Sequence, residues 1–282
     1  MPATRVRSPA VAGAFYPRDP VALRHALESS FAAPRGPGQD PANASPTRKE
    51  RRILAGIVPH AGYIYSGPIA AHFFARLAAE PRPAAVVLLG VNHQGAEGLL
   101  SLSDEDWRTP LGVVPTDREL MRSLAKPPIA IDGLAHHREH SLEVELPFLQ
   151  YLWPDPPPIV ALQVTFTELS LLKEAGEVVA RALHGRDVLL IASTDFSHYL
   201  PVSEARRLDD LAIEAVLSGS PDRLYRTVMD QDISMCGIAP TTVLLSALQG
   251  TGLRPQLLAK GSSADAEPMD TVVGYASFVV ER

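Results

Sequence analysis

The sequence predicts an α/β fold with a mostly parallel or mixed central sheet. Short apolar runs alternate along the chain with segments of helical periodicity, the order typical of this fold class. Several runs are continuously apolar and rich in β-branched residues, as in strands buried on both faces. The 282 residues are 46% apolar, enough to bury a sizeable core, and no apolar run approaches the roughly 18 residues of a membrane helix.

The N-terminal part is expected to hold one short helix followed by an irregular loop. Residues 21–31 have helical periodicity, with Asp19 as a plausible N-cap and Pro20 at the first position. Residues 34–50 begin with a stretch rich in Pro, Gly, Ala, Asn and Ser, which indicates a flexible surface loop. Since little that could fold alone precedes this loop, we expect residues 1–282 to form a single domain.

The rest of the chain is expected to alternate strands and helices. The expected strands are residues 53–58, 84–91, 159–164, 187–192 and 272–280. The expected helices are residues 68–79, 116–125, 141–152, 168–183, 203–217, 221–229 and 237–248. Thr116, with Glu119 three residues later, is predicted to cap the second of these helices, and Pro147 to kink or break the third.

The charge balance narrows the partners that we expect. The 26 Lys and Arg residues against 32 Asp and Glu residues give a net charge of -6. Nonspecific binding to nucleic acid or to an anionic membrane favours a basic patch, so we expect neither partner.

The apolar segment at residues 9–15 is too short, and too interrupted by Pro and Gly, for a signal peptide. We therefore expect a cytoplasmic protein.

Three of the predicted strands are followed by side chains that could carry chemistry. His60 and His93 follow the first and second strands, each in a loop that contains glycine. Asp195 and His198 follow the fourth strand. Because ligands bind beyond the carboxyl ends of strands in open α/β sheets, these side chains are candidates for one site. The alternative is that they serve only the structure of their loops.

Cys236 is the single cysteine, which excludes an internal disulfide and a zinc site made of several cysteines. It precedes a predicted helix, whose dipole is expected to lower the pKa of the thiol. With His60 and His93 it would form a set of three metal ligands that leaves positions open for water or substrate. A thiolate favours iron, copper or zinc over magnesium or calcium. The alternative is a small buried apolar residue.

Three further side chains are candidates to act beside the metal. Asp195 could accept the second ring N–H of a metal-bound histidine, and His198 could act as a general acid or base. His140 and Glu143 lie three residues apart at a predicted helix start. We prefer His140, because acidic residues at that position, Glu145 included, are favoured by the helix dipole alone.

The other histidines and the common catalytic motifs add no further candidates. His136 and His137 lie in a polar loop and are expected at the surface. The sequence contains no P-loop, no Gly-x-Gly-x-x-Gly, no Gly-x-Ser-x-Gly and no His-Glu-x-x-His motif. The absence of these motifs argues against the nucleotide-binding, hydrolase and metalloprotease functions that commonly depend on them.

A series of collinear motifs resembles the Memo family. The motifs extend from Arg7 to Tyr275, nearly the whole chain. They are RSPAVAGAFYP at residues 7–17, PHAGY at 59–63 with the Ser-Gly pair at 66–67, RTPLG at 108–112, EHSLE at 139–143, STDFSHY at 193–199 and Cys-Gly at 236–237. The bacterial and archaeal branch of this family is often named AmmeMemoRadiSam system protein B.

This resemblance implies a fold similar to that of the class III extradiol dioxygenases, with a central mixed sheet and helices on both faces. It also implies a set of two histidines and one cysteine for the metal, and a group of pocket side chains beside it. These are His60, His93 and Cys236 for the metal, and His140, Asp195 and His198 for the pocket. Family members have been linked to iron or copper binding and redox chemistry, and the animal member to phosphotyrosine-peptide binding. The name of the bacterial branch implies AMMECR-type and radical SAM proteins as partners.

Three functions remain open at this point. The first is a redox-active protein that holds one iron or copper ion; a thiolate in place of the dioxygenase carboxylate argues against ring cleavage, because sulfur changes the potential of the metal and is itself oxidisable. The second is a binding module whose pocket holds a peptide or small-molecule ligand without turnover. The third is a zinc-dependent hydrolase, since two histidines, one cysteine and a water also suit zinc.

Overall fold

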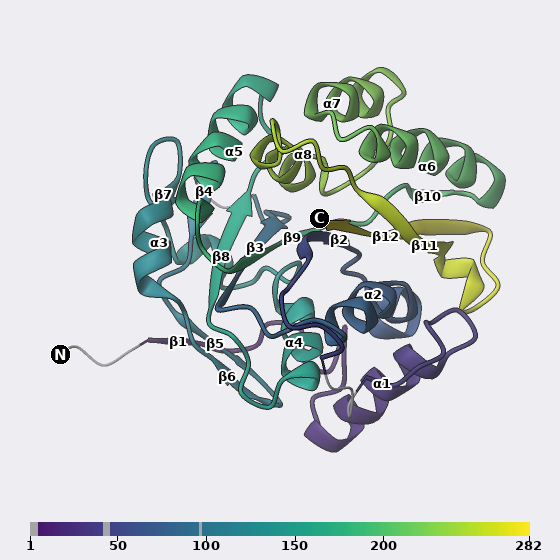
Figure 1. The fold of residues 1–282 in the computed structure, drawn as a ribbon. Coiled ribbons are helices and arrows are strands. Elements are labelled where there is room, and N and C mark those ends of the chain that lie inside the picture. Colours follow the sequence, from purple (N-terminus) through teal and green to yellow (C-terminus); the bar gives the residue numbers. More distant parts are fainter. Residues whose placement is uncertain (1–4, 42–45, 96–97) are drawn as a thin grey trace.

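The computed structural model describes residues 5–41, 46–95 and 98–282. A central mixed sheet carries helices on both faces, which confirms the predicted fold class (Figure 1). The order of strands in the sheet is β10-β12-β2-β9-β3-β8-β4-β7, with β11 paired to β12. These strands are β2 (Ile53–Val58), β3 (Ala85–Val91), β4 (Leu100–Leu102), β7 (Ala130–Ile131), β8 (Ile159–Val164), β9 (Val188–Ser193), β10 (His198–Pro201), β11 (Gln256–Ser262) and β12 (Thr271–Glu281).

The middle of the sheet is parallel and buried on both faces. Strands β2, β9, β3 and β8 run parallel, and β12 joins β2 in the antiparallel sense. Side chains of β3 alternate between two cores: Val87 and Leu89 lie in one, and Val86 and Leu88 lie in the other. A period of two with apolar residues on both faces explains why these strands read as continuous apolar runs.

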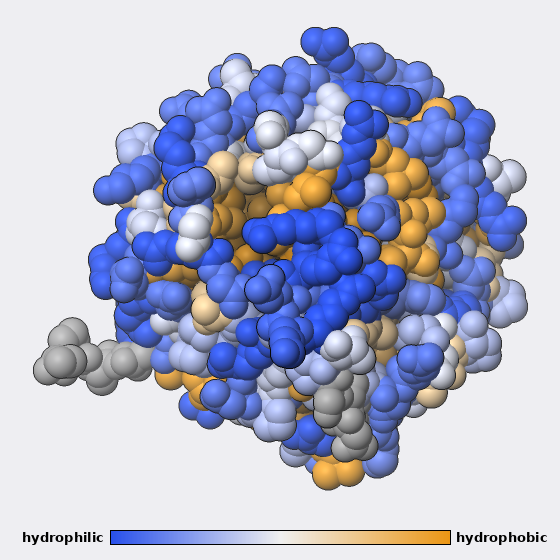
Figure 2. Space-filling view, viewed as in Figure 1, coloured by the Kyte–Doolittle hydropathy of each residue, from blue (hydrophilic) through white to orange (hydrophobic). Residues whose placement is uncertain are grey.

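The helices form one layer on each side of the sheet (Figure 1). One layer contains α1 (Pro20–Ala32), α2 (Tyr63–Ala78) and α4 (Leu146–Leu152). The other contains α3 (Arg118–Leu124), α5 (Leu169–Leu183), α6 (Val202–Leu217), α7 (Pro221–Asp230) and α8 (Ile238–Ala247). Hydrophilic residues cover most of the face in Figure 2, and hydrophobic residues show mainly in the recesses between them. No helix among the described residues is long and apolar enough to cross a membrane.

Two predicted helices begin later than the sequence indicated. The helix expected from Thr116 starts at Arg118, because the carboxylate of Asp117 accepts the backbone N–H of Glu119 and of Leu120. The helix expected at residues 141–152 is a 3-10 turn at residues 143–145 followed by α4. Pro147 therefore lies in the first turn of α4, where its missing N–H costs nothing, and it does not kink a longer helix.

The short strands were not predicted. β1 (Val6–Arg7), β5 (Asp106–Thr109) and β6 (Gly112–Val114) form a small separate sheet, and β4, β7, β10 and β11 extend the ends of the main sheet. Most of these segments are too short or too polar to give an apolar run. Residues 34–41 and 46–50 contain no helix or strand, as expected of the predicted loop, and residues 42–45 lie outside the described residues.

Candidate metal centre

Three parallel strands bring the predicted side chains to one edge of the sheet. β2 and β3 both pair with β9, so the loops that follow these three strands are neighbours. His60 lies in the loop after β2, His93 in the loop after β3 and Asp195 in the loop after β9. The shared direction of the strands therefore brings together residues that are up to 135 positions apart in sequence.

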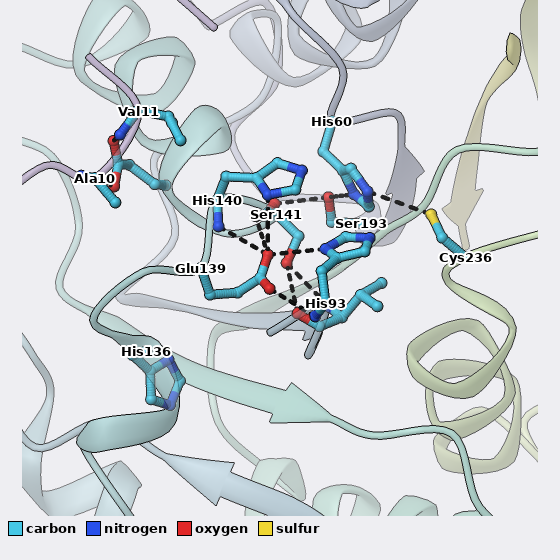
Figure 3. Close-up of polar contacts among 12 residues, drawn as sticks. Ala10, Val11, His60, His93, His136, Glu139, His140, Ser141, Ser193 and Cys236 are labelled. Carbon is cyan, nitrogen blue, oxygen red and sulfur yellow. Dashed lines mark hydrogen bonds and ion pairs between the residues drawn. The ribbon is translucent and has the colours of Figure 1, made fainter. Parts of the chain in front are cut away.

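His60, His93 and Cys236 have their ligand atoms within 4.8 Å of one another. The Nε2 atom of His60 lies 3.3 Å from the Sγ atom of Cys236, and the rings of His60 and His93 meet edge to face at 5.2 Å (Figure 3). Two ligands of one ion lie at most the sum of two bond lengths apart, about 4.4 Å for nitrogen and sulfur on zinc. The spacing of the three atoms is therefore close to that of ligands on one ion.

Cys236 reaches the site because glycine follows it. A Cβ atom at Gly237 would lie 2.2 Å from the Cβ atom of Thr194, so a larger residue would push α8 away from the end of β9. The Sγ atom of Cys236 accepts the backbone N–H of Asp195 at 3.2 Å. Burial, with the nearby carboxyl of Asp195, raises the pKa of the thiol, so the expected lowering by the helix dipole is wrong. Desolvation at this position outweighs the field of the helix end.

His60 is oriented by a buried chain of polar groups. Its Nδ1 atom lies 2.8 Å from the hydroxyl of Ser193, which also lies 2.9 Å from the carboxyl of Glu145. With Nδ1 donating to Ser193, the lone pair of Nε2 faces Cys236. Burial, followed by the charges of the neighbouring histidines, lowers the pKa of His60 well below its usual value. The ring is therefore neutral, the form that binds metals.

Asp195 holds the backbone of the His60 loop and not a histidine ring. Its Oδ1 atom accepts the backbone N–H of His60 at 2.9 Å. The expectation that Asp195 would accept the second ring N–H of a metal-bound histidine is therefore wrong, because Ser193 takes that position at His60 and Glu139 takes it at His93. Burial raises the pKa of Asp195 to about 7, despite the backbone N–H groups that favour its charged form.

Glu139, which sequence reasoning gave no role, orients His93. One carboxylate oxygen lies 3.0 Å from Nδ1 of His93 and accepts the backbone N–H groups of His140 and Ser141. The other accepts the backbone N–H of His93 at 2.7 Å. Burial alone would raise the pKa of Glu139, but these donors and the neighbouring histidines lower it to about 2. The signals in the sequence were its place directly before His140 and at the start of the EHSLE motif.

His140 and His198 line the same pocket as the metal candidates. The ring of His140 stacks on that of His93 at 4.7 Å, and burial lowers its pKa to about 4, so it is neutral near pH 7. Nδ1 of His198 lies 2.8 Å from the carbonyl oxygen of Ser234. The pocket has a volume of about 460 Å³. Its lining includes all the predicted site residues except the thiol: His60, His93, His140, Asp195 and His198.

His136 is buried and not at the surface, which corrects the sequence-based expectation. Its ring meets that of Trp107 edge to face at 5.7 Å, and its Nε2 atom lies 2.8 Å from the carbonyl oxygen of Ser101. The backbone carbonyl of His136 accepts the Nε–H of Arg7. These partners are distant in sequence and no local pattern reveals them. His137 is half exposed and pairs with Glu105 at 3.3 Å.

The burial of His136 predicts a loss of stability in acid. Burial lowers its pKa to about 4, from an ordinary value near 6.5, so the unfolded chain binds more protons in this interval. The free energy of unfolding should therefore fall as the pH drops from about 6.5 to about 4, by roughly 3 kcal/mol from this group. Urea titrations across this range should show a shallower dependence of the unfolding free energy on pH in His136→Phe, and an unchanged one in the exposed control His184→Gln. Parallel curves for the wild type and His136→Phe would contradict the assignment.

Comparisons with known proteins identify the family. The family model described as Memo-like protein matches residues 7–279. A MEMO1 family protein of Methanococcoides burtonii is 38% identical over 279 residues, covering 98% of this chain and 100% of its own length. One of Aeropyrum pernix is 40% identical, covering 96% and 98%. The crystal structure of an uncharacterized protein from Escherichia coli K12 shares the fold, with a TM-score of 0.57, 17% identity, and coverage of 82% of this chain and 100% of that one.

These matches extend over nearly the whole chain, as the collinear motifs do. The observed fold is consistent with the class III extradiol dioxygenase-like fold that the resemblance implied. A possible metal-binding group of two histidines and one cysteine lies at the carboxyl ends of its parallel strands. The chain belongs to the Memo-like family.

Proposed function

We propose that the chain binds one iron or copper ion through His60, His93 and Cys236 and acts in a redox reaction on a ligand in the adjoining pocket. The observation that carries the proposal is the approach of two imidazole nitrogens and one sulfur to within 4.8 Å of one another. Three protein ligands leave positions open, as in catalytic metal sites.

The chemistry of the donors supports a transition metal ion at this site. A thiolate and two imidazoles suit iron, copper and zinc, and suit magnesium and calcium poorly. When bound, iron or copper would supply a change of oxidation state beside the pocket. Because burial raises the pKa of Cys236, binding the ion must displace the thiol proton, and metal affinity should rise with pH.

The side chains around the metal ligands can move protons. Asp195, with a pKa raised to about 7, can give or take a proton near neutral pH. His140 is neutral and can accept one, and His198 lines the same pocket. We assign proton transfer to these three residues. AMMECR-type and radical SAM partners, and a cytoplasmic location, stay predictions from the sequence.

Anaerobic metal uptake tests the proposal. We expect purified protein to bind one iron or copper ion per chain by elemental analysis, with an absorption band from sulfur-to-metal charge transfer on oxidised metal. Cys236→Ala should lose the band and weaken metal binding by at least about 100-fold. Removing a group that only orients a metal ligand already weakens binding about 10- to 100-fold, and Cys236 is a ligand itself. His25→Ala, an exposed histidine on α1, should bind as the wild type does.

Other outcomes would replace the proposal. Uptake of neither iron nor copper by protein with an intact thiol would refute it, as would an unchanged affinity in Cys236→Ala. Uptake of zinc alone, with hydrolytic activity that is lost when iron replaces zinc, would establish the zinc hydrolase instead. Ligand binding by metal-free protein without any turnover of loaded protein would establish a binding module.

A further inference from the structure

A second pocket of about 630 Å³ adjoins the pocket of the metal centre. It lies between the segment at residues 13–17 and the start of α2, with α1 along one side. The two pockets share Phe15, Gly62 and Tyr65 in their linings. The lining of the second pocket is mostly apolar, with aromatic, alanine and proline side chains. A ligand longer than the first pocket could therefore extend past Phe15 and Tyr65 into the second.

Arg35 is the one charged residue among the described residues that line this second pocket. Its position follows from the sequence of α2. Pro68 lies inside the helix and has no N–H, so the carbonyl of Ile64 lacks its usual partner four residues on. Arg35 donates to the carbonyls of Ile64 and Tyr65, each at 3.4 Å. These long contacts use two of the five guanidinium donors and hold the group at the pocket.

The charge of Arg35 has no carboxylate partner among the residues that the structure describes. Its described contacts are to backbone carbonyls, and no carboxylate of the described residues forms an ion pair with it. Arg51 and Arg76 are each within 3.0 Å of a carboxylate oxygen, by contrast. A half-buried guanidinium in a mostly apolar pocket has lost part of its hydration. Charge-assisted hydrogen bonds to an anionic ligand would replace the hydrogen bonds to water that the guanidinium has lost.

We propose that this second pocket binds the carboxylate of an elongated organic acid. The remaining part of the acid lies along Phe15 and Tyr65, toward the histidines of the first pocket. A carboxylate fits better than a phosphate, because the lining offers one unit of positive charge and a phosphate monoester carries nearly two negative charges near pH 7. The planar guanidinium also matches a carboxylate with two parallel hydrogen bonds. Only the identification of this acid as the substrate class rests on the proposed function, since binding of the carboxylate needs no metal.

Calorimetry on metal-free protein tests the inference with a series of ω-phenylalkanoates, from benzoate to 5-phenylpentanoate. The corresponding primary alcohols serve as neutral counterparts, and phenyl phosphate as the dianionic one. At least one longer acid should bind about 10- to 100-fold more tightly than its alcohol, the effect of a hydrogen-bonded charge. Arg35→Gln should reduce the acid to the affinity of the alcohol. Arg24→Gln, an exposed arginine of α1 outside both pockets, should leave it unchanged.

Each alternative result overturns the inference. Equal binding of acid and alcohol, no binding by any acid, or full binding by Arg35→Gln would show that Arg35 recognises no carboxylate. Tighter binding of phenyl phosphate than of every acid would replace the carboxylate by a phosphate. Because all of these titrations use metal-free protein, they can fail while metal uptake succeeds, and the reverse, so the two failures are distinguishable.

Discussion

Replacing Glu143 by alanine is expected to lower the free energy of unfolding by about 3–5 kcal/mol, the cost of breaking a buried ion pair from one side. Its carboxylate is fully buried and lies 2.6 Å from Nη1 of Arg7. The same carboxylate accepts the hydroxyl of Tyr16 at 2.6 Å and the backbone N–H groups of Ala10 and Val11. Without it, the buried guanidinium of Arg7 would lose its counter-charge and keep only backbone carbonyls as acceptors. The buried hydroxyl of Tyr16 and the two part-buried backbone N–H groups would lose their acceptor.

This loss should be measured by urea denaturation, with Glu204→Gln as the control. Glu204 also pairs with an arginine, but the pair is exposed and its removal should change stability little. Arg7→Met should destabilise the protein too, because it leaves the carboxylate of Glu143 buried without its cation. A change below about 1 kcal/mol in Glu143→Ala would contradict the argument, since that is the net value of one ordinary hydrogen bond.

The sequence predicted the convergence of the site because strand direction determines it. Once residues 53–58, 84–91 and 187–192 are recognised as parallel strands, the residues after them share one edge of the sheet. His60 and His93 were identified in this way, whereas Cys236 was proposed as the single thiol before a predicted helix, and the family motifs then supported all three. The position of each loop depends on the backbone, which local apolar periodicity largely determines.

The electrostatic surroundings of the site could not be predicted in the same way. Whether a charged residue is buried depends on segments far away in the sequence: Arg7 reaches Glu143 across 136 positions. The dipole of the helix after Cys236 predicts a lowered pKa for the thiol, but desolvation by segments distant in sequence raises it. Glu143 was explained by its place at a helix start, although its real partners are in the N-terminal segment.

Glu139→Gln is expected to weaken metal binding about 10- to 100-fold, the usual effect of removing the group that orients a ligand histidine. The two carboxylate oxygens accept four N–H groups, from the backbone of His93, His140 and Ser141 and from the ring of His93. An amide has only one oxygen, so its NH2 group must face at least one of these donors. In either orientation of the amide, the ring or the backbone N–H of His93 faces the NH2 group and loses its acceptor, so the orientation of His93 is disturbed.

Metal titration of Glu139→Gln, with the exposed Glu177→Gln as control, measures this effect. The pKa of Glu139 is lowered to about 2, so the carboxylate stays charged from about pH 4 upward. The ratio of wild-type to variant affinity should therefore be constant above that pH, although both affinities rise with pH as the thiol of Cys236 loses its proton. A pure folding role for Glu139 would instead lower the unfolding free energy and leave the affinity of the folded protein unchanged. That outcome would mean that His93 is held by its backbone alone and that its ring needs no acceptor to bind the ion.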